Sequence, residues 1–172
     1  MQLIIGLGNP DKDYQFTRHN LGHQVISRLS VKLQTKLTSQ PKFNANLSKV
    51  KNTLLGITTE YMNNSGLSVQ KILNYYKIEP QNLYLIHDDL DLGVGEWKKQ
   101  FDRGPAGHNG VISTINHIQT QQFWRYRLGI GHPEGNMPVE SYVLQPFTPN
   151  EKVIIDQTID KIVEDLIALI DT

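Results

Sequence analysis

Short apolar runs along the chain predict the strands of a buried sheet. Residues 2–8 and the segment Leu83-Tyr84-Leu85-Ile86 are largely apolar, which is typical of strands covered on both faces. The first run ends at Asn9-Pro10-Asp11, a sequence that favours a turn. The other predicted strands are a hairpin over residues 44–60 that turns near Asn52-Thr53, a polar edge strand over 94–101, and strands over 124–131 and 139–144.

Apolar residues that recur every three or four positions predict the helices. Residues 20–35 carry one such stripe, and Thr148-Pro149-Asn150-Glu151 is a capping box that predicts a final helix. Helices are also predicted after Ser65-Gly66, ending before Pro80, and from Gly107-His108-Asn109-Gly110 onward. Strands that alternate with helices predict one α/β domain over residues 1–172, with a mixed, partly parallel, twisted sheet flanked by helices.

The composition excludes several kinds of site. The 172 residues include no cysteine, which excludes a disulfide framework, a cysteine nucleophile and a thiolate metal site. The N-terminus has no basic region of the kind that begins a signal peptide, and no segment approaches the ~20 apolar residues of a membrane span. We therefore expect a cytoplasmic protein that does not associate with membranes, and we expect it to be a monomer.

The charge is balanced overall but unevenly distributed. The chain has 17 basic and 17 acidic residues, yet residues 150–172 hold six acids and two bases, so residues 1–149 carry an excess of four basic residues. A basic body with an acidic final helix is compatible with a phosphate-binding face. Charge alone fits an ordinary solvated surface equally well.

Two polar segments are candidates for chemistry. Thr17-Arg18-His19-Asn20 precedes the first predicted helix, and the helix dipole there disfavours a cationic histidine, which leaves His19 available as a base. His87-Asp88-Asp89-Leu90-Asp91 follows the most buried strand, where catalytic groups collect in open α/β sheets. The carboxylates there suit either a metal ion or the orientation of a histidine. A surface histidine and a polar turn are the simpler interpretations.

Two other patterns are weaker. Gly6-Leu7-Gly8 resembles the start of a dinucleotide-binding loop, but Asp11 occupies the position of the third glycine and Asn9-Pro10 interrupts the helix entry. His19 and His23 have the i, i+4 spacing of a metal-binding pair, which with the acidic run suggests a metallohydrolase. No glutamate lies between these two histidines, so the metal hypothesis remains the minor one.

A third segment suggests contact with nucleic acid. The glycine-bearing loop over residues 104–110 allows a close approach of backbone to substrate. Lys98, Lys99 and Arg103 lie just before it, interleaved with Trp97 and Phe101, and such alternation favours nucleic-acid binding over a plain edge strand. We expect the acidic final helix to face away from these bases.

Taken in order, these segments resemble those of the bacterial-type peptidyl-tRNA hydrolases. Each block alone is weak, but the ordered set is specific and extends to about residue 150. The matching blocks are Gly6-Leu7-Gly8-Asn9-Pro10, Tyr14, Thr17-Arg18-His19-Asn20 with Gly22, Met62-Asn63 with Ser65-Gly66, His87-Asp88-Asp89-Leu90-Asp91-Leu92, Gly107-His108-Asn109-Gly110, Arg127-Leu128-Gly129-Ile130-Gly131 with Pro133, and Tyr142-Val143-Leu144.

The resemblance implies an enzyme that hydrolyses the ester between a peptide and the 3′-terminal ribose of tRNA, without a cofactor or a metal. It implies that His19 is the catalytic base and Asp88 the residue that orients it. A non-catalytic RNA-binding relative on the same fold is the alternative. The implied substrate-binding residues are Asn9, Tyr14, Met62, Asn63, His108 and Asn109.

The expected tRNA-binding residues are basic. Lys98 and Arg127 match basic positions of the family on the tRNA side, and Lys99 and Arg103 are added because they lie in the same basic segment. Gln100 occupies a position where a second basic residue is frequent, and Pro105-Ala106 alters the glycine-rich loop.

Overall fold

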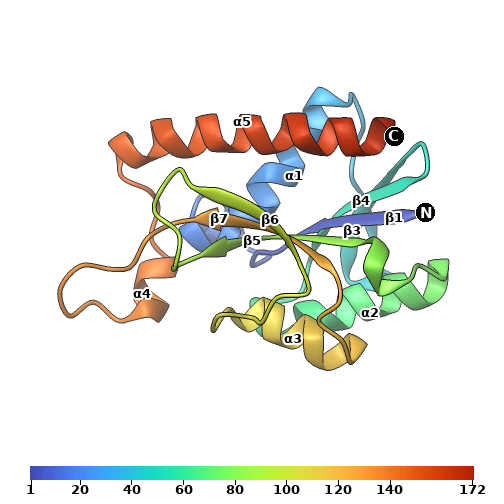
Figure 1. The fold of residues 1–172 in the computed structure, drawn as a ribbon, viewed down its shortest axis with the longest axis horizontal. Helices are drawn as coiled ribbons and strands as arrows, with labels where there is room; N and C mark the ends of the chain where they lie inside the picture. The colour runs from blue at the N-terminus through green and yellow to red at the C-terminus, as the bar shows by residue number, and fades with distance from the viewer.

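The computed structural model describes all 172 residues and is built on a seven-stranded mixed sheet (Figure 1). The strand order is β2-β3-β4-β1-β5-β7-β6; β4, β1, β5 and β7 run parallel to one another, and the remaining pairs are antiparallel. This arrangement confirms the predicted α/β class. The strands are β1 (Gln2–Gly6), β2 (Thr38–Gln40), β3 (Ala45–Val50), β4 (Thr53–Thr58), β5 (Leu83–Asp89), β6 (Trp97–Phe101) and β7 (Trp124–Gly129).

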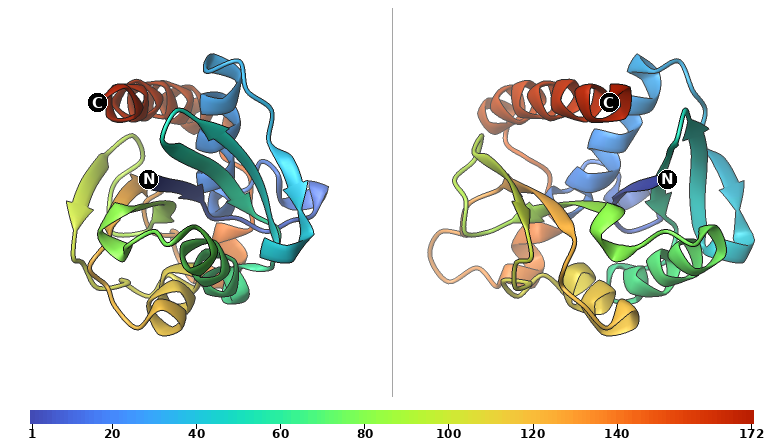
Figure 2. Two further views of the ribbon diagram at one scale, coloured as in Figure 1. Left: turned by 90° about the vertical axis from the view of Figure 1, so that its right-hand side faces the viewer. Right: turned by 45° about the vertical axis from the view of Figure 1, so that its right-hand side comes forward.

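Helices cover both faces of the sheet. The helices are α1 (Leu21–Lys32), α2 (Ser65–Tyr76), α3 (Asn109–Ile118), α4 (Val139–Val143) and α5 (Pro149–Asp171). Helices α1 and α5 lie on one face, and α2 and α3 lie on the other (Figures 1 and 2). Two apolar cores result: Val25, Tyr126 and Ile162 belong to the first, and Leu85, Val69 and Val111 to the second. None of these helices is long and apolar enough to cross a membrane.

Most of the predicted elements are confirmed. The strands predicted over 2–8 and 124–131 are β1 and β7, and the hairpin over 44–60 consists of β3 and β4, with its turn at residues 51–52. The polar strand β6 lies at an edge of the sheet, as predicted. The side chain of Thr148 accepts a hydrogen bond from the amide of Glu151, and so closes the predicted capping box of α5.

The prediction of a strand over residues 139–144 is wrong, because these residues form the short helix α4. The amide of Tyr142 donates to the carbonyl of Pro138 over 3.1 Å. Strand β7 already has a neighbour on each side, so no free sheet edge is left beside it. Tyr142 and Val143 are both buried although they are consecutive, and in a strand they would point to opposite faces.

Gly22 lets the start of α1 approach the sheet closely. A Cβ atom at this position would lie 2.3 Å from the carbonyl oxygen of Ile86 in β5 and 2.4 Å from the amide nitrogen of Leu7. Any side chain would therefore push α1 away from the sheet. The close contact holds the residues before α1 beside the carboxyl end of β5.

Candidate active site

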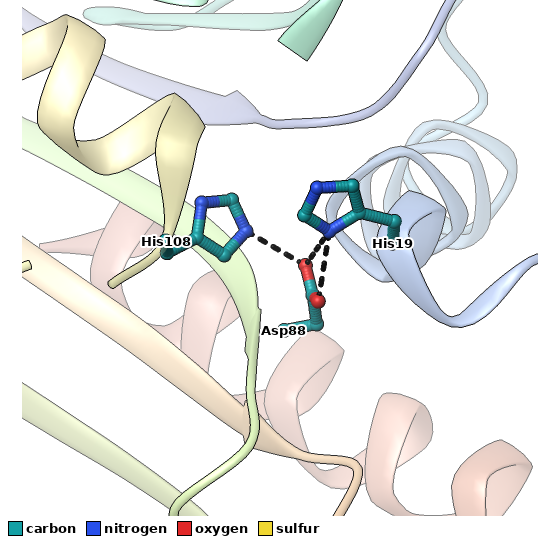
Figure 3. Close-up of side chains that lie close together, drawn as sticks. All are labelled: His19, Asp88 and His108. Atoms are coloured by element: carbon teal, nitrogen blue, oxygen red, sulfur yellow. Dashed lines mark hydrogen bonds and ion pairs between the residues drawn. The ribbon is translucent and has the colours of Figure 1, made fainter. Parts of the chain in front are cut away.

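Three polar side chains from different elements meet at the carboxyl end of β5 (Figure 3). Asp88 is one of the last residues of β5, His19 lies in the 3₁₀ turn (Arg18–Asn20) that directly precedes α1, and His108 directly precedes α3. Parallel sheets collect side chains in this way, because the loops that follow their strands leave at the same edge. The structure therefore brings together two predicted catalytic residues and one predicted substrate-binding residue.

His19 is oriented by Asp88. The Nδ1 atom of His19 lies 2.9 Å from Oδ2 and 3.1 Å from Oδ1 of Asp88. Side-chain exposure is 12% for His19 and 2% for Asp88, so the pair is largely shielded from water. Because Nδ1 faces the carboxylate, its proton is donated to Asp88, and Nε2 keeps a free lone pair.

His108 contacts the same carboxylate from the other side. Its Nε2 atom lies 2.8 Å from Oδ1 of Asp88. Its Nδ1 atom accepts hydrogen bonds from the amides of Gly110 (3.1 Å) and Val111 (3.4 Å) at the start of α3. An accepting Nδ1 has no proton, so the proton of the ring is on Nε2 and is donated to Asp88.

The electrostatics of the cluster favour an ionised aspartate and a basic histidine. Burial alone would raise the pKa of Asp88, but the charges and hydrogen bonds of His19 and His108 hold it well below its usual range. Burial lowers the pKa of His19, and the charge of Asp88 and its hydrogen bond more than compensate, so the pKa is raised. Burial lowers the pKa of the adjacent His87 to about 3, which keeps this side chain neutral.

A cleft of about 180 Å³ opens beside the cluster. It is lined by His19, by residues 88–90, by residues 105–109, and by Val139, Glu140 and Val143. No serine, threonine or cysteine is among them, so the cleft offers no hydroxyl or thiol nucleophile. The arrangement suits a hydrolytic enzyme in which a histidine activates water.

Asn9 does not line the cleft, but its side-chain amide is held in one orientation and its backbone is bonded to Asn20, the residue after His19. Its Oδ1 atom accepts the amide proton of Met62 over 2.9 Å, which leaves the NH₂ group of Asn9 as a free donor. Asn20 fixes the backbone of Asn9 from the other side with two hydrogen bonds of 2.9 Å. Asn9, Asn20 and Met62 are all buried.

The other predicted substrate-binding residues differ in position. Asn109 lines the cleft, and Asn63 is exposed directly after Met62. Tyr14 does not line the cleft, and its backbone carbonyl accepts hydrogen bonds from the amide and the hydroxyl of Thr17. Tyr14 thus shapes the turn that leads to His19.

The four predicted tRNA-binding residues do not share one surface. Lys98 is exposed, and its neighbour across the strands is Arg127. Arg127 is buried, with its Nε atom 2.7 Å from Oδ2 of Asp89, and it also donates to Gln100. Arg103 is exposed in the loop after β6.

Lys99 points to the opposite face of the sheet. Its Nζ atom lies 3.5 Å from Oδ2 of Asp165 in α5 and 5.4 Å from the centre of the Tyr126 ring. The expectation that the acidic final helix faces away from all the bases is therefore wrong for Lys99. The reason is the alternation of side chains along β6, which sends adjacent lysines to opposite faces.

The structure also bears on whether this region could hold a metal ion. His23 lies behind Gly8, outside the cleft, and its burial lowers its pKa to about 4. It therefore does not converge with His19 on one ion. His19, Asp88 and His108 offer ligand atoms within 4.8 Å of one another. The nitrogen of His108 that faces Asp88 bears a proton, however, and a protonated nitrogen has no lone pair for a metal.

Sequence reasoning missed three features of the site. Asn20 was part of a matching block, but its spacing from Asn9 gave no indication of their hydrogen bonds. In the sequence His87 is only part of an acidic run, whereas in the structure its ring packs against His108 with the centroids 4.9 Å apart. The wall contributed by α4 was not expected, because that segment was predicted to be a strand.

Comparisons with known proteins identify a family. The family model of peptidyl-tRNA hydrolase matches residues 3–172. A peptidyl-tRNA hydrolase of Francisella tularensis subsp. tularensis (strain FSC 198) is 43% identical over 164 residues, which cover 93% of this chain and 86% of the relative. One of Bacillus cytotoxicus is 40% identical over 164 residues, covering 94% and 88%.

A solved structure shows the same fold. The crystal structure of peptidyl-tRNA hydrolase from Acinetobacter baumannii superimposes with a TM-score of 0.92 at 34% sequence identity, and the match covers 99% of this chain and 89% of that one. The chain belongs to the peptidyl-tRNA hydrolase family.

Proposed function

We propose that this chain hydrolyses the ester between a peptide and the 3′-terminal ribose of tRNA, with His19 as the general base. The observation that carries the proposal is the contact of 2.9 Å between His19 and a buried Asp88, beside a cleft that offers no hydroxyl or thiol nucleophile. Membership of the peptidyl-tRNA hydrolase family supplies the substrate class. The family match also disfavours a purely RNA-binding role. The place of action follows from the substrate: the cytoplasm, where translation takes place.

The reaction needs only a positioned base and donors for the oxyanion. His19 Nε2 takes a proton from water, the hydroxide attacks the ester carbonyl, and the tetrahedral intermediate collapses with cleavage of the bond to the ribose oxygen. The imidazolium then returns its proton to that oxygen. Asp88 fixes the tautomer of His19 and stabilises the imidazolium, and such a base contributes ~10²–10⁴ in rate.

Asparagine side chains supply the donors in this scheme. The free NH₂ group of Asn9 and the amide of Asn109 suit the developing oxyanion and the peptide backbone. Met62 is joined to Asn9 by a hydrogen bond and Asn63 follows it in the chain, so we assign both to the same side of the substrate.

For the tRNA body, the exposed bases on the cleft side of β6 are the best candidates. We assign this role to Lys98 and Arg103, with the buried Arg127 opposite Lys98 on the neighbouring strand β7. Lys99 is left out, because it pairs with Asp165 on the other face.

Release of tRNA from a purified N-blocked aminoacyl-tRNA tests the proposal. The wild-type protein should release tRNA in the presence of EDTA, and the His19→Ala variant should not. Loss of activity with EDTA that one divalent ion restores at stoichiometric amounts would contradict the metal-free scheme. Absence of release by the folded wild-type chain would contradict the assignment of the substrate.

A further inference from the structure

We infer that His108 is a positioning residue that orients Asp88 and tunes His19, and not a residue that binds substrate through its ring nitrogens. This inference rests on the proposed function, because it concerns the same reaction. It differs from the expectation drawn from the sequence, in which His108 was one of the substrate-binding residues. The hydrogen bonds of the ring carry the argument.

Both nitrogens of His108 are already occupied. Nδ1 accepts the amides of Gly110 and Val111, so it serves as the N-terminal cap of α3. Nε2 donates to Oδ1 of Asp88 over 2.8 Å. An imidazole has only these two polar atoms, and the side chain is 7% exposed. No hydrogen-bonding group of His108 is left for a substrate.

The hydrogen bonds that cap α3 determine which atom donates in the hydrogen bond between His108 and Asp88. Because backbone amides are donors only, Nδ1 of His108 accepts and Nε2 donates. The start of α3 therefore fixes the tautomer of His108, and His108 in turn fixes one oxygen of Asp88. His19 reaches the same carboxylate at 2.9 and 3.1 Å. The orientation of the base thus depends on a chain of contacts that begins at a helix terminus (Figure 3).

Packing holds the ring in place. The His108 ring lies between the rings of His19 and His87, with centroids 4.8 and 4.9 Å away. His87 is buried, and its Nδ1 atom contacts the carbonyl oxygen of Asp88 at 2.8 Å. The ring of His108 cannot rotate without disturbing its neighbours on both sides.

The hydrogen bond that His108 donates to Asp88 also affects the proton affinity of His19. A hydrogen bond to the carboxylate stabilises its negative charge locally, so that less of this charge acts on His19. Loss of His108 should therefore strengthen the hold of Asp88 on the His19 proton. The other ionisable groups nearby are Asp89, which is paired with Arg127, the buried His87, and Glu140 across the cleft. Arg18, next to His19, is paired with Glu151.

The His108→Asn variant separates the two hydrogen-bonding roles of His108, which are to cap α3 and to donate to Asp88. Asparagine is a preferred N-cap residue, so α3 stays capped, but its side chain is too short to reach Asp88. We expect kcat on an N-blocked aminoacyl-tRNA to fall ~10-fold with KM within ~2-fold, and the acid limb of the pH–rate profile to move up by ~0.5 pH unit. A raised KM with an unchanged pH profile would overturn the inference.

Asn109→Ala serves as the matched control, because Asn109 is the next residue and lines the cleft. It should raise KM and leave the pH profile in place. A double-mutant cycle adds a second readout: in an Asp88→Asn background, His108→Asn should cause no further loss of kcat, since no carboxylate remains to be oriented. Equal losses in both backgrounds would show that His108 acts independently of Asp88.

A spectroscopic measurement on the wild-type protein does not depend on any variant. The ¹⁵N NMR signals of His108 at pH 8 should show a protonated Nε2 and an unprotonated Nδ1. The opposite tautomer would exclude the proposed direction of the bond to Asp88. The inference can fail in these ways while the wild-type protein still releases tRNA, so its failure is distinct from a failure of the proposed function.

Discussion

Arg18 joins the turn that carries His19 to the first turn of α5. Its Nη1 atom donates to Oε2 of Glu151 over 2.8 Å, and Glu151 also belongs to the capping box of that helix. The guanidinium lies over the rings of Tyr142 and Phe147, 4.3 and 4.9 Å from their centres. A single buried side chain thus connects the catalytic turn, α4 and α5.

The first prediction concerns this contact and stability. Arg18→Met should lower the free energy of unfolding by ~2 kcal/mol, through loss of a charge-assisted hydrogen bond and of the stacking on two rings. Arg18→Lys keeps the charge but loses the planar stacking, so it should recover only part of the loss. Urea unfolding at pH 7, followed by circular dichroism, measures both variants.

The same pair should make stability depend on pH. Burial would raise the pKa of Glu151, but the hydrogen bonds with Thr148 and Arg18 and the charge of Arg18 lower it below 4.5. A group with a lowered pKa in the folded state stabilises fully above its unfolded pKa, and this contribution is lost as pH falls through the folded pKa. The stability difference between wild type and Arg18→Met should therefore shrink below pH 4.5. A constant difference at all pH values would show that Glu151 is not its source.

The second prediction concerns the base. His19→Ala should leave the fold intact and lower kcat by at least ~10², the lower end for loss of a general base. In the wild type, the acid limb of kcat/KM should have its midpoint above the ordinary histidine value of 6.5, because Asp88 raises the pKa of His19 and only the neutral ring accepts a proton. Stopped assays from pH 5 to 9 measure this midpoint. Near-normal turnover by a folded His19→Ala protein would remove His19 from the mechanism.

The third prediction separates orientation from binding. Asp88→Asn removes the charge that raises the pKa of His19, so the acid limb should move to lower pH and kcat should fall by ~10² or more. KM should change little, since Asp88 is 2% exposed and its oxygens are occupied by two histidines. A variant whose main defect is a raised KM would place Asp88 in substrate binding instead.

The sequence predicted the contact between His19 and Asp88 better than it predicted the surroundings of the two residues. The family resemblance paired His19 with Asp88, and each also lies at a recognisable feature, His19 just before a helix and Asp88 at the end of a buried strand. Their distance of 2.9 Å depends on Gly22, whose missing side chain lets α1 approach β5. Spacing along the chain does not report such a close approach between two distant segments.

Two errors came from reading periodicity in short segments. Residues 139–144 are too few to distinguish a period of two from one of 3.6, and the decisive fact is that β7 already has a neighbouring strand on each side. Lys98 and Lys99 are predicted to belong to one basic patch, although adjacent residues of a strand point to opposite faces. The alternation of side chains along the predicted strand therefore already indicated that only one of the two lysines could lie on the face of Arg127.

The last prediction uses these two lysines as a matched pair. Lys98 is exposed on the side of the sheet that carries Arg127, whereas Lys99 contacts Asp165 of α5 on the other side. Lys98→Glu should raise KM for a full-length N-blocked aminoacyl-tRNA and flatten the log–log salt dependence by ~0.7–0.9 per lost phosphate contact. Lys99→Glu makes the same change in net charge at the adjacent position but on the other face, so it should leave KM nearly unchanged. It should lower stability, because it places a second carboxylate beside that of Asp165.

On a minimal substrate, a peptide esterified to a short 3′-terminal oligonucleotide, both variants should resemble the wild type, because phosphate contacts position the tRNA body and take no part in the chemistry. Equal increases in KM for the two variants would mean that net charge, and not the face of β6 that carries Lys98, attracts the tRNA.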